Sequence, residues 1–175
     1  RQQDIAAQSI VPLLGIAPGM TMLDLCAAPG NKTAQALAAG ANVTACDRYL
    51  RRLLDVPGEA ARVALDASAP LPFSRKFDRI LVDAPCSGTG TLSRNPEIKW
   101  RVQPTDLADF AVAQHTILEN ALECLAPGGK LVYSTCSLER QENEEVVAGL
   151  PVTEMVHRIP GRDPGDGFFS AVITP

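Results

Sequence analysis

Residues 23–33 read LDLCAAPGNKT, and this stretch joins an apolar run to a helical pattern through a turn of small residues. The apolar run at residues 20–26 predicts a β-strand, and NKTAQALAAG at residues 31–40 predicts a helix that ends at a glycine. Small residues and Gly30 let the backbone approach a ligand closely. The turn matches neither the G-x-G-x-x-G pattern nor the Walker pattern, so it gives little support to a dinucleotide site or a P-loop.

Further apolar runs predict strands at residues 42–47, 62–66, 78–84, 130–135 and 168–174. Most of the runs are nearly continuous, which predicts strands buried on both faces, as in a parallel sheet. Helical patterns lie at residues 5–14, 105–129 and 140–150. Strands that alternate with helices predict right-handed βαβ units and an α/β fold, doubly wound, with helices on both faces of the sheet. The segment between Asp47 and Asp66 is short, so its crossover helix must be brief.

The composition, with 46% hydrophobic and 21% charged residues, indicates one globular domain over residues 1–175. The longest apolar runs are shorter than the roughly 20 residues of a membrane helix, and the polar start is no signal peptide, so no membrane association is expected. The chain begins without methionine, so we expect a piece of a longer protein. Five cysteines without a C-x-x-C pair indicate a reducing compartment, which predicts a cytoplasmic protein and no metal site.

The charge is distributed unevenly. The net charge of −4 does not by itself favour nucleic-acid binding, but residues 1–101 carry +3 and residues 102–175 carry −7. The basic residues of the first part cluster locally, at Arg48, Arg51, Arg52, Arg75, Lys76, Arg79, Arg94, Lys99 and Arg101. These clusters fit a solvated surface or a phosphate-contacting patch equally well. The acidic segment at residues 139–145 is expected to be the solvated start of a helix.

Four successive apolar runs end in, or are followed at once by, an acid or a thiol: Asp47, Asp66, Asp83 and Cys136. In doubly wound sheets, ligands bind at the carboxyl ends of the strands. Asp47 lies seventeen residues after Gly30, near the spacing of the acid that binds a ribose hydroxyl pair. A lone aspartate after a strand is more often a helix cap, but capping alone does not explain the whole set.

Several motifs together resemble the RNA cytosine-5 methyltransferases of the Sun/RsmB (NOL/NOP/Sun) family. They are LDLCAAPGNKT, DAPCSGTG, RNPEIKW, YSTCSLERQENEEVV and DGFF, and they occur in order from QQDIAAQS near the start to the end of the chain. The pair DAPCSG and STCS is the most specific part. The resemblance implies a Rossmann-like, S-adenosylmethionine-dependent methyltransferase fold. Its mostly parallel sheet would have seven strands with the last one antiparallel.

The same resemblance implies a binding site for S-adenosyl-L-methionine. It assigns the cofactor to Cys26, Ala27, Ala28, Pro29, Gly30, Asn31, Lys32, Asp47, Asp66 and Asp83. Asp47 would hold the ribose hydroxyls, Asp66 would face the adenine, and Asp83 would lie between cofactor and base. This family usually has a second glycine where Asn31 stands, and we expect Asn31 to tolerate a left-handed turn there. The short segment before Asp66 puts the adenine contact in question.

The resemblance also assigns catalytic roles to Cys136, Cys86 and Asp83. Cytosine C5 is too weak a nucleophile to take a methyl group directly, and a thiolate that adds to C6 activates it. Cys136 would be this nucleophile, with a lowered pKa aided by a helix that begins near residues 138–140. Asp83 would contact N3 of the base, and Cys86 would help to release the product.

The RNA partner would be ribosomal or transfer RNA, held in part by SRNPEIKWR at residues 93–101. Arg94, Lys99, Trp100 and Arg101 combine charge with an aromatic ring, which suits phosphate contact and base stacking. The alternative is a surface loop that Trp100 anchors to the core. Most family members carry RNA-binding segments before this core, and we expect these segments to be absent here. We also expect the protein to be a monomer.

Two other functions are compatible with the motifs. In a DNA cytosine-5 methyltransferase, the cysteine of DAPC would be the nucleophile, so Cys86 would attack and Cys136 would be spare. In a catalytically decayed scaffold, the domain would bind cofactor or RNA without methyl transfer. Retention of both cysteines and of the three acids favours an active enzyme.

Overall fold

The computed structural model describes residues 3–175, and these form a seven-stranded sheet in the order β3-β2-β1-β4-β5-β7-β6. The strands are β1 (Thr21–Asp24), β2 (Asn42–Asp47), β3 (Ala61–Ala64), β4 (Phe77–Asp83), β5 (Leu125–Thr135), β6 (Val152–Arg158) and β7 (Phe168–Ile173). Strand β7 runs antiparallel to both β5 and β6, whereas the other pairs are parallel. The expected α/β fold with an antiparallel last strand is therefore confirmed.

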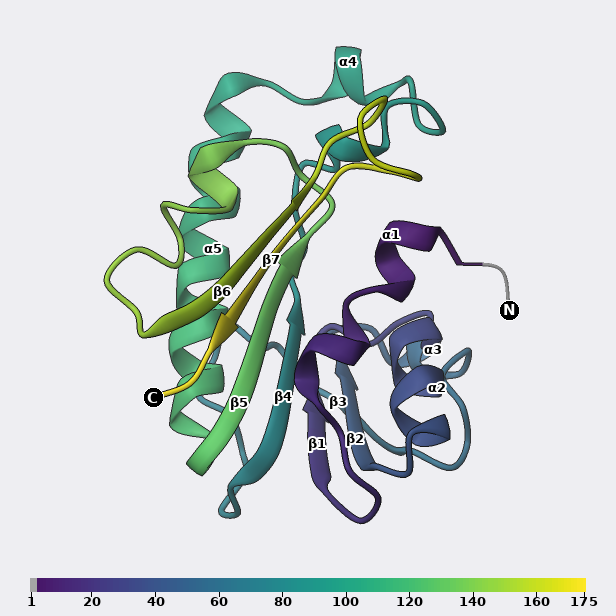
Figure 1. Ribbon diagram of the computed structural model, residues 1–175, viewed down its shortest axis with the longest axis vertical. Helices are drawn as coiled ribbons and strands as arrows, with labels where there is room; N and C mark the ends of the chain where they lie inside the picture. The colour runs from purple at the N-terminus through teal and green to yellow at the C-terminus, as the bar shows by residue number, and fades with distance from the viewer. Residues whose placement is uncertain (1–2) are drawn as a thin grey trace.

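Helices cover both faces of the sheet, as expected (Figure 1). Helix α5 (Pro104–Glu123) lies along one face, while α1 (Ile5–Gln8), α2 (Asn31–Ala38) and α3 (Leu50–Leu53) lie on the other. The remaining helical turns are η1 (Val11–Leu14), η2 (Thr89–Thr91), α4 (Ile98–Arg101) and η3 (Arg140–Glu142). The four-residue α3 is the brief crossover helix that the short segment between Asp47 and Asp66 predicts.

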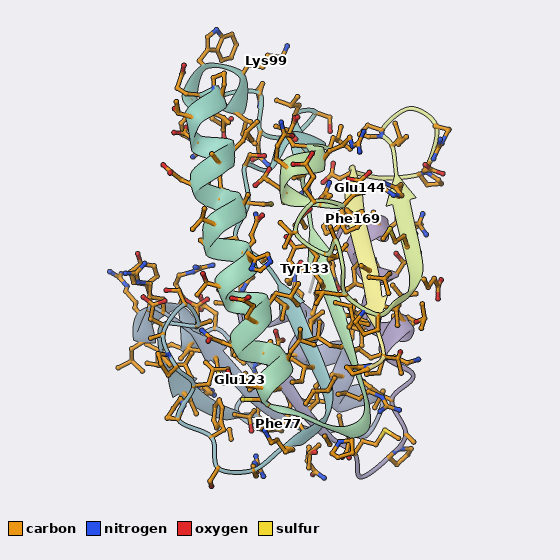
Figure 2. The ribbon with its side chains drawn as sticks, turned by 90° about the vertical axis from the view of Figure 1, so that its left-hand side faces the viewer. Phe77, Lys99, Glu123, Tyr133, Glu144 and Phe169 are labelled. Carbon is orange, nitrogen blue, oxygen red and sulfur yellow. The ribbon has the colours of Figure 1, made fainter. Side chains whose placement is uncertain are left out.

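Alternation along the central strands divides the core into two layers. Ile80 and Tyr133 face the layer beneath α5, whereas Leu81 and Val132 face the layer beneath α1, α2 and α3. Figure 2 shows α5 lying along the sheet, with Tyr133 and Phe169 to its right and Phe77 near its C-terminal end. Because both faces of these strands are buried, their sequences are apolar almost without interruption.

Several expected element boundaries were wrong, and each has a local cause. The helix expected at residues 105–129 ends at Glu123, since Leu125 already pairs with Phe77 in the sheet. The helix expected at residues 5–14 is split into α1 and η1, and Pro12 lies at the start of η1. The helix expected at residues 140–150 is only the single turn η3, followed by further turns.

The two edge strands depart from the prediction of strands buried on both faces. Strand β3 is mostly exposed, and β6, for which no apolar run was found, alternates irregularly between exposed and half-buried residues. An edge strand covers less of the core, so polar residues are tolerated along it and its sequence resembles a loop.

Candidate active site

Parallel strands place three acids at one edge of the sheet. Asp24, Asp47 and Asp83 end β1, β2 and β4, and a cavity of about 670 Å³ and a second of about 450 Å³ open beside them. Both cavities are lined by Asp83, Cys136, Cys26 and Ala28. These shared residues therefore form a boundary at which ligands in the two cavities would meet.

The turn at residues 26–32 forms one wall of the first cavity. It contributes Cys26, Ala27, Ala28, Pro29, Asn31 and Lys32 to the lining. Gly30 closes the turn with φ 92°, the left-handed conformation that glycine adopts without strain, and caps α2. Asn31 begins the helix, and no non-glycine residue among residues 3–175 has a positive φ, so the left-handed turn expected at Asn31 is wrong.

Asp47 and Asp66 both line the second cavity. Each also accepts a hydrogen bond from the backbone N–H two residues further on, at 3.0 Å, so both acids stabilise a local turn as well. Arg52 lies 3.5 Å from the Asp47 carboxylate, and Arg48 lies 3.3 Å from that of Asp66. Two of the predicted basic residues therefore contact the predicted acids at the rim of this cavity.

Asp24 is a site residue that the sequence analysis did not single out. It is buried beneath the first cavity, where one carboxylate oxygen accepts a hydrogen bond of 2.7 Å from Thr33 and the other has no partner among the described residues. Burial raises the pKa of the Asp24 carboxyl to about 7. Its place at the end of the first apolar run, before the small-residue turn, was the available signal.

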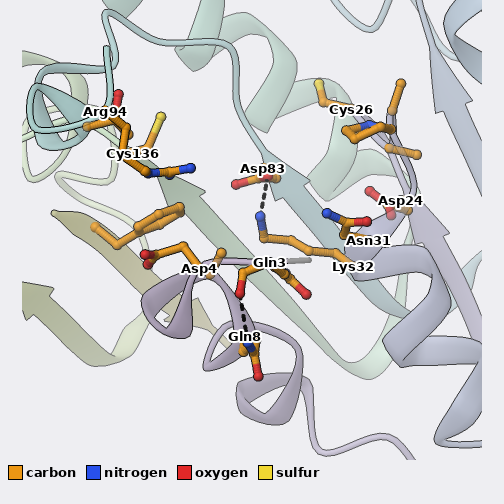
Figure 3. A pocket seen from close by; sticks show the side chains of 16 residues that line it. Gln3, Asp4, Gln8, Asp24, Cys26, Asn31, Lys32, Asp83, Arg94 and Cys136 are labelled. Atoms are coloured by element: carbon orange, nitrogen blue, oxygen red, sulfur yellow. Dashed lines mark hydrogen bonds and ion pairs between the residues drawn. The ribbon is translucent and has the colours of Figure 1, made fainter. Parts of the chain in front are cut away.

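An ion pair joins the turn to β4 in the first cavity, as Figure 3 shows. Lys32 Nζ lies 2.6 Å from Asp83 Oδ2, and Ser134 donates to the other oxygen at 2.8 Å. Burial acts to lower the pKa of Lys32, but the Asp83 carboxylate outweighs it and raises that pKa. The side chain of Asp83 therefore has a defined orientation between the two cavities.

The two thiols meet beside this ion pair. Cys86 follows β4 and Cys136 follows β5, and their sulfur atoms lie 3.4 Å apart. A hydrogen bond from the Cys86 thiol lowers the pKa of Cys136, and Lys32 adds to this effect. The same contact, together with burial, raises the pKa of Cys86 well above its usual range. Cys136 is therefore the better nucleophile and Cys86 the proton donor of the pair.

The helix dipole expected near Cys136 is absent, because η3 is a single turn. The expectation that residues 139–145 form a solvated helix start is likewise wrong for Glu142, which is 0% exposed. Two other cysteines, Cys46 and Cys124, lie in the core layer beneath α5. Among residues 3–175, no group of three or more histidine, cysteine or acidic residues could hold a metal ion.

Comparison with known proteins shows the family to which this chain belongs. The family model of the 16S rRNA methyltransferases RsmB/F matches residues 11–150. The chain belongs to this family. The ribosomal RNA small subunit methyltransferase B of Cronobacter sakazakii is 38% identical over 194 residues, and the protein of the same name from Citrobacter koseri is 39% identical. Each match covers 97% of this chain and 45% of the relative, so the chain spans just under half of these relatives.

Solved structures agree with the family assignment. The crystal structure of NSun6 from Pyrococcus horikoshii with SFG superposes with a TM-score of 0.88 at 25% identity. The match covers 98% of this chain and 52% of that one. The predicted resemblance to the Sun/RsmB methyltransferases is confirmed, and so is their Rossmann-like fold.

The predicted RNA-contacting residues fall into two groups. Arg94 lines the first cavity and forms an ion pair with the buried Asp166. Lys99, Trp100 and Arg101 lie on α4, and Trp100 is 76% exposed, so the alternative that it anchors the loop to the core is wrong. Figure 2 shows Lys99 at the far end of the molecule from Phe77. A third cavity of about 430 Å³ is lined by both Arg101 and Cys86.

Proposed function

We propose that this domain transfers a methyl group from S-adenosyl-L-methionine to C5 of a cytosine in RNA, with 16S ribosomal RNA as the substrate class. The observation that carries the proposal is the pair of thiols 3.4 Å apart, beside the Lys32–Asp83 ion pair, between two adjoining cavities. Residues 1–175 would act as one catalytic domain, as a monomer in the cytoplasm. No helix within residues 3–175 is long and apolar enough to cross a membrane.

The residues around the cavities suit this cofactor. Asp47 and Asp66 offer carboxylates to the ribose hydroxyls and to the adenine side, and the turn at residues 26–32 offers a close-packed backbone. The unpartnered oxygen of Asp24 is an acceptor for the amino group of the methionine part. When bound, the cofactor supplies the electrophilic methyl group.

The thiol pair suits covalent catalysis. The Cys136 thiolate would add to C6 of the base, and Asp83, oriented by Lys32, would protonate N3 or donate a hydrogen bond to it as the ring gains electron density. Once Cys136 is bonded to carbon, it no longer accepts the hydrogen bond that raises the pKa of Cys86. The pKa of Cys86 then falls, so Cys86 would release its own proton to solvent, and its thiolate would accept the C5 proton as the C5–H and sulfur–C6 bonds break.

Methyl transfer from labelled S-adenosylmethionine to unmodified 16S rRNA tests the activity. Cys136→Ala is expected to abolish the transfer, and Cys86→Ala to trap a covalent protein–RNA adduct that is visible on a denaturing gel. Full activity in Cys136→Ala would refute the mechanism.

A substrate that contains 5-fluorocytosine separates this proposal from the DNA-type alternative. The adduct is expected at Cys136, and an adduct at Cys86 would instead support attack by the first thiol. Calorimetry with S-adenosylmethionine tests the scaffold alternative, since binding without transfer to any RNA would favour a decayed enzyme.

A further inference from the structure

A buried carboxylate lies behind the thiol pair. Glu142, on η3, is 0% exposed, and its carboxylate accepts four hydrogen bonds. One oxygen accepts from Ser87 N at 2.8 Å and from Gln114 Nε2 at 3.0 Å. The other accepts from the hydroxyls of Ser87 and Ser137, each at 2.5 Å. These donors account for the hydrogen-bonding capacity of an ionised carboxylate.

The donors belong to the two turns that carry the thiols. Ser87 directly follows Cys86, and Ser137 directly follows Cys136. Gln114, from α5, also donates to the carbonyl of Pro85 at 2.9 Å, on the other side of Cys86. The Glu142 carboxylate therefore connects Ser87 and Ser137, the residues that follow the two thiols. Its partner Gln114 also holds Pro85, the residue before Cys86.

The turn that carries Glu142 is itself fixed to β5. The Tyr133 hydroxyl donates to the Glu142 backbone carbonyl at 2.6 Å. The next residue, Asn143, accepts from the Thr135 hydroxyl at 2.5 Å and donates to the Ser137 carbonyl at 3.0 Å. The carboxylate is therefore held at a constant place relative to the end of the strand.

Burial of a charge here is not explained by stability alone. Glu142 forms no ion pair with a lysine, arginine or histidine among residues 3–175. Desolvation of a carboxylate is unfavourable, and apolar residues of similar volume often stabilise a buried site at least as well. The arrangement of donors therefore points to a geometric role.

We propose that Glu142 is a positioning residue whose carboxylate sets the separation of the Cys86 and Cys136 sulfur atoms. The inference rests on the proposed roles of the two thiols. It is testable in the free protein, where thiol chemistry needs neither RNA nor cofactor.

Loss of the carboxylate would change the reactivity of the nucleophile in a defined direction. Without it the two turns can separate, and Cys136 loses the hydrogen bond from Cys86 that lowers its pKa. The charged groups Asp83, Lys32 and Arg94 lie around Cys136 on other segments and remain in place. The pKa of Cys136 is therefore expected to rise in Glu142→Ala.

The conservative variant Glu142→Gln separates geometry from charge. The amide oxygen can accept from the two nitrogen donors, while the amide nitrogen donates to the Ser87 and Ser137 hydroxyls, which rotate to accept. Glu142→Gln is therefore expected to keep the thiol geometry and most of the activity. Glu142→Ala is expected to slow methyl transfer by about 100-fold, the effect of misplacing a reacting group by about 1 Å.

The measurement is the rate of iodoacetamide alkylation against pH. Trypsin releases Cys86 in residues 80–94 and Cys136 in residues 131–140, so mass spectrometry reads each thiol separately. Phenylarsine oxide, which binds two neighbouring thiols at once, reports their separation. Glu142→Ala is expected to move the Cys136 profile to higher pH and to lose most of the arsenical capture.

Two controls match the test variant. Glu145→Ala removes an exposed acid three residues further on, and Val146→Ala destabilises the same segment by truncating a buried apolar side chain. Both are expected to keep the parent's alkylation profile. If Glu142→Ala does not fold, Ser137→Ala, which removes one donor, is expected to shift the profile in the same direction by a smaller amount.

The outcomes distinguish the proposals. A lower melting temperature in Glu142→Ala with unchanged alkylation and arsenical capture would show a purely structural role and overturn the inference. The inference is supported if the Cys136 alkylation profile is shifted in Glu142→Ala and returns to that of the parent in Glu142→Gln. This support holds even if neither the variants nor the parent methylate RNA. That last result would count against the proposed function alone.

Discussion

Replacement of Gly90 with alanine is expected to destabilise the domain and to displace the nucleophile. Gly90, in η2, lies between two backbone segments: its N–H donates to the Cys136 carbonyl at 2.9 Å, and its carbonyl accepts from Gly167 N at 2.8 Å. A Cβ atom at this position would overlap the Gly167 carbonyl and lie 2.8 Å from the Cys136 carbonyl oxygen. Both obstacles are backbone atoms, so the chain itself must move.

The magnitude follows from these contacts. Two backbone hydrogen bonds are weakened, at about 1 kcal/mol each, and overpacking adds about 1–3 kcal/mol. Alanine also reduces the conformational entropy of the unfolded chain, which offsets about 0.4–1 kcal/mol of this loss of stability. The free energy of unfolding is therefore expected to fall by about 2–4 kcal/mol, which lowers the melting temperature of a domain of this size by roughly 5–15 °C. Methyl transfer is expected to slow by about 100-fold because Cys136 moves.

Thermal unfolding and labelled methyl transfer measure the two effects, with Gly58→Ala as the matched control. A Cβ at Gly58 would meet only the end of the flexible Arg62 side chain, at 3.0 Å, so its stability should change by about 0.5 kcal/mol or less. A Gly90→Ala variant that melts and reacts like Gly58→Ala would refute the reasoning.

Four further substitutions test the site: three remove a charge, and the fourth removes an exposed aromatic ring. Asp24→Asn is expected to stabilise the free protein at pH 8 by on the order of 1–4 kcal/mol while weakening cofactor binding in calorimetry. Burial raises the pKa of Asp24 to about 7, so the folded parent is most stable at low pH, where Asp24 is protonated. The free energy of unfolding of the parent therefore decreases as the pH rises from about 4 to about 7. The melting temperature of Asp24→Asn should fall less than that of the parent over this range. Lys32→Met is expected to raise the pKa of Cys136, so that iodoacetamide alkylation below pH 8 slows. Arg94→Ala is expected to lower the melting temperature because it leaves a buried carboxylate unpaired, whereas Trp100→Ala should weaken RNA binding in a gel-shift assay without changing the melting temperature.

The sequence predicted the position of a strand well where both faces of that strand are buried. Strands β1, β2, β4 and β7, and the buried second half of β5, lie within or close to the predicted ranges, because a strand segment covered on both faces is apolar along its whole length. It was uninformative for β6, whose half-exposed residues resemble a loop, and for residues 140–150, where a polar pattern predicted a solvated helix. Glu142 shows the reason: the partners that make its burial tolerable are distant in the chain, so no local pattern indicates them.

The sequence by itself determined the fold class, the small-residue turn before α2 and the two thiol motifs, because each depends on local propensity and on burial of the segment that contains it. Only the tertiary structure decided that two cysteines fifty residues apart come within 3.4 Å. Adjacent parallel strands β4 and β5 pair Asp83 with Ser134, which brings the turns after them together. It also decided that Arg94 pairs with Asp166, 72 residues away. Such pairings depend on strand order and register, and many distant contacts set these together.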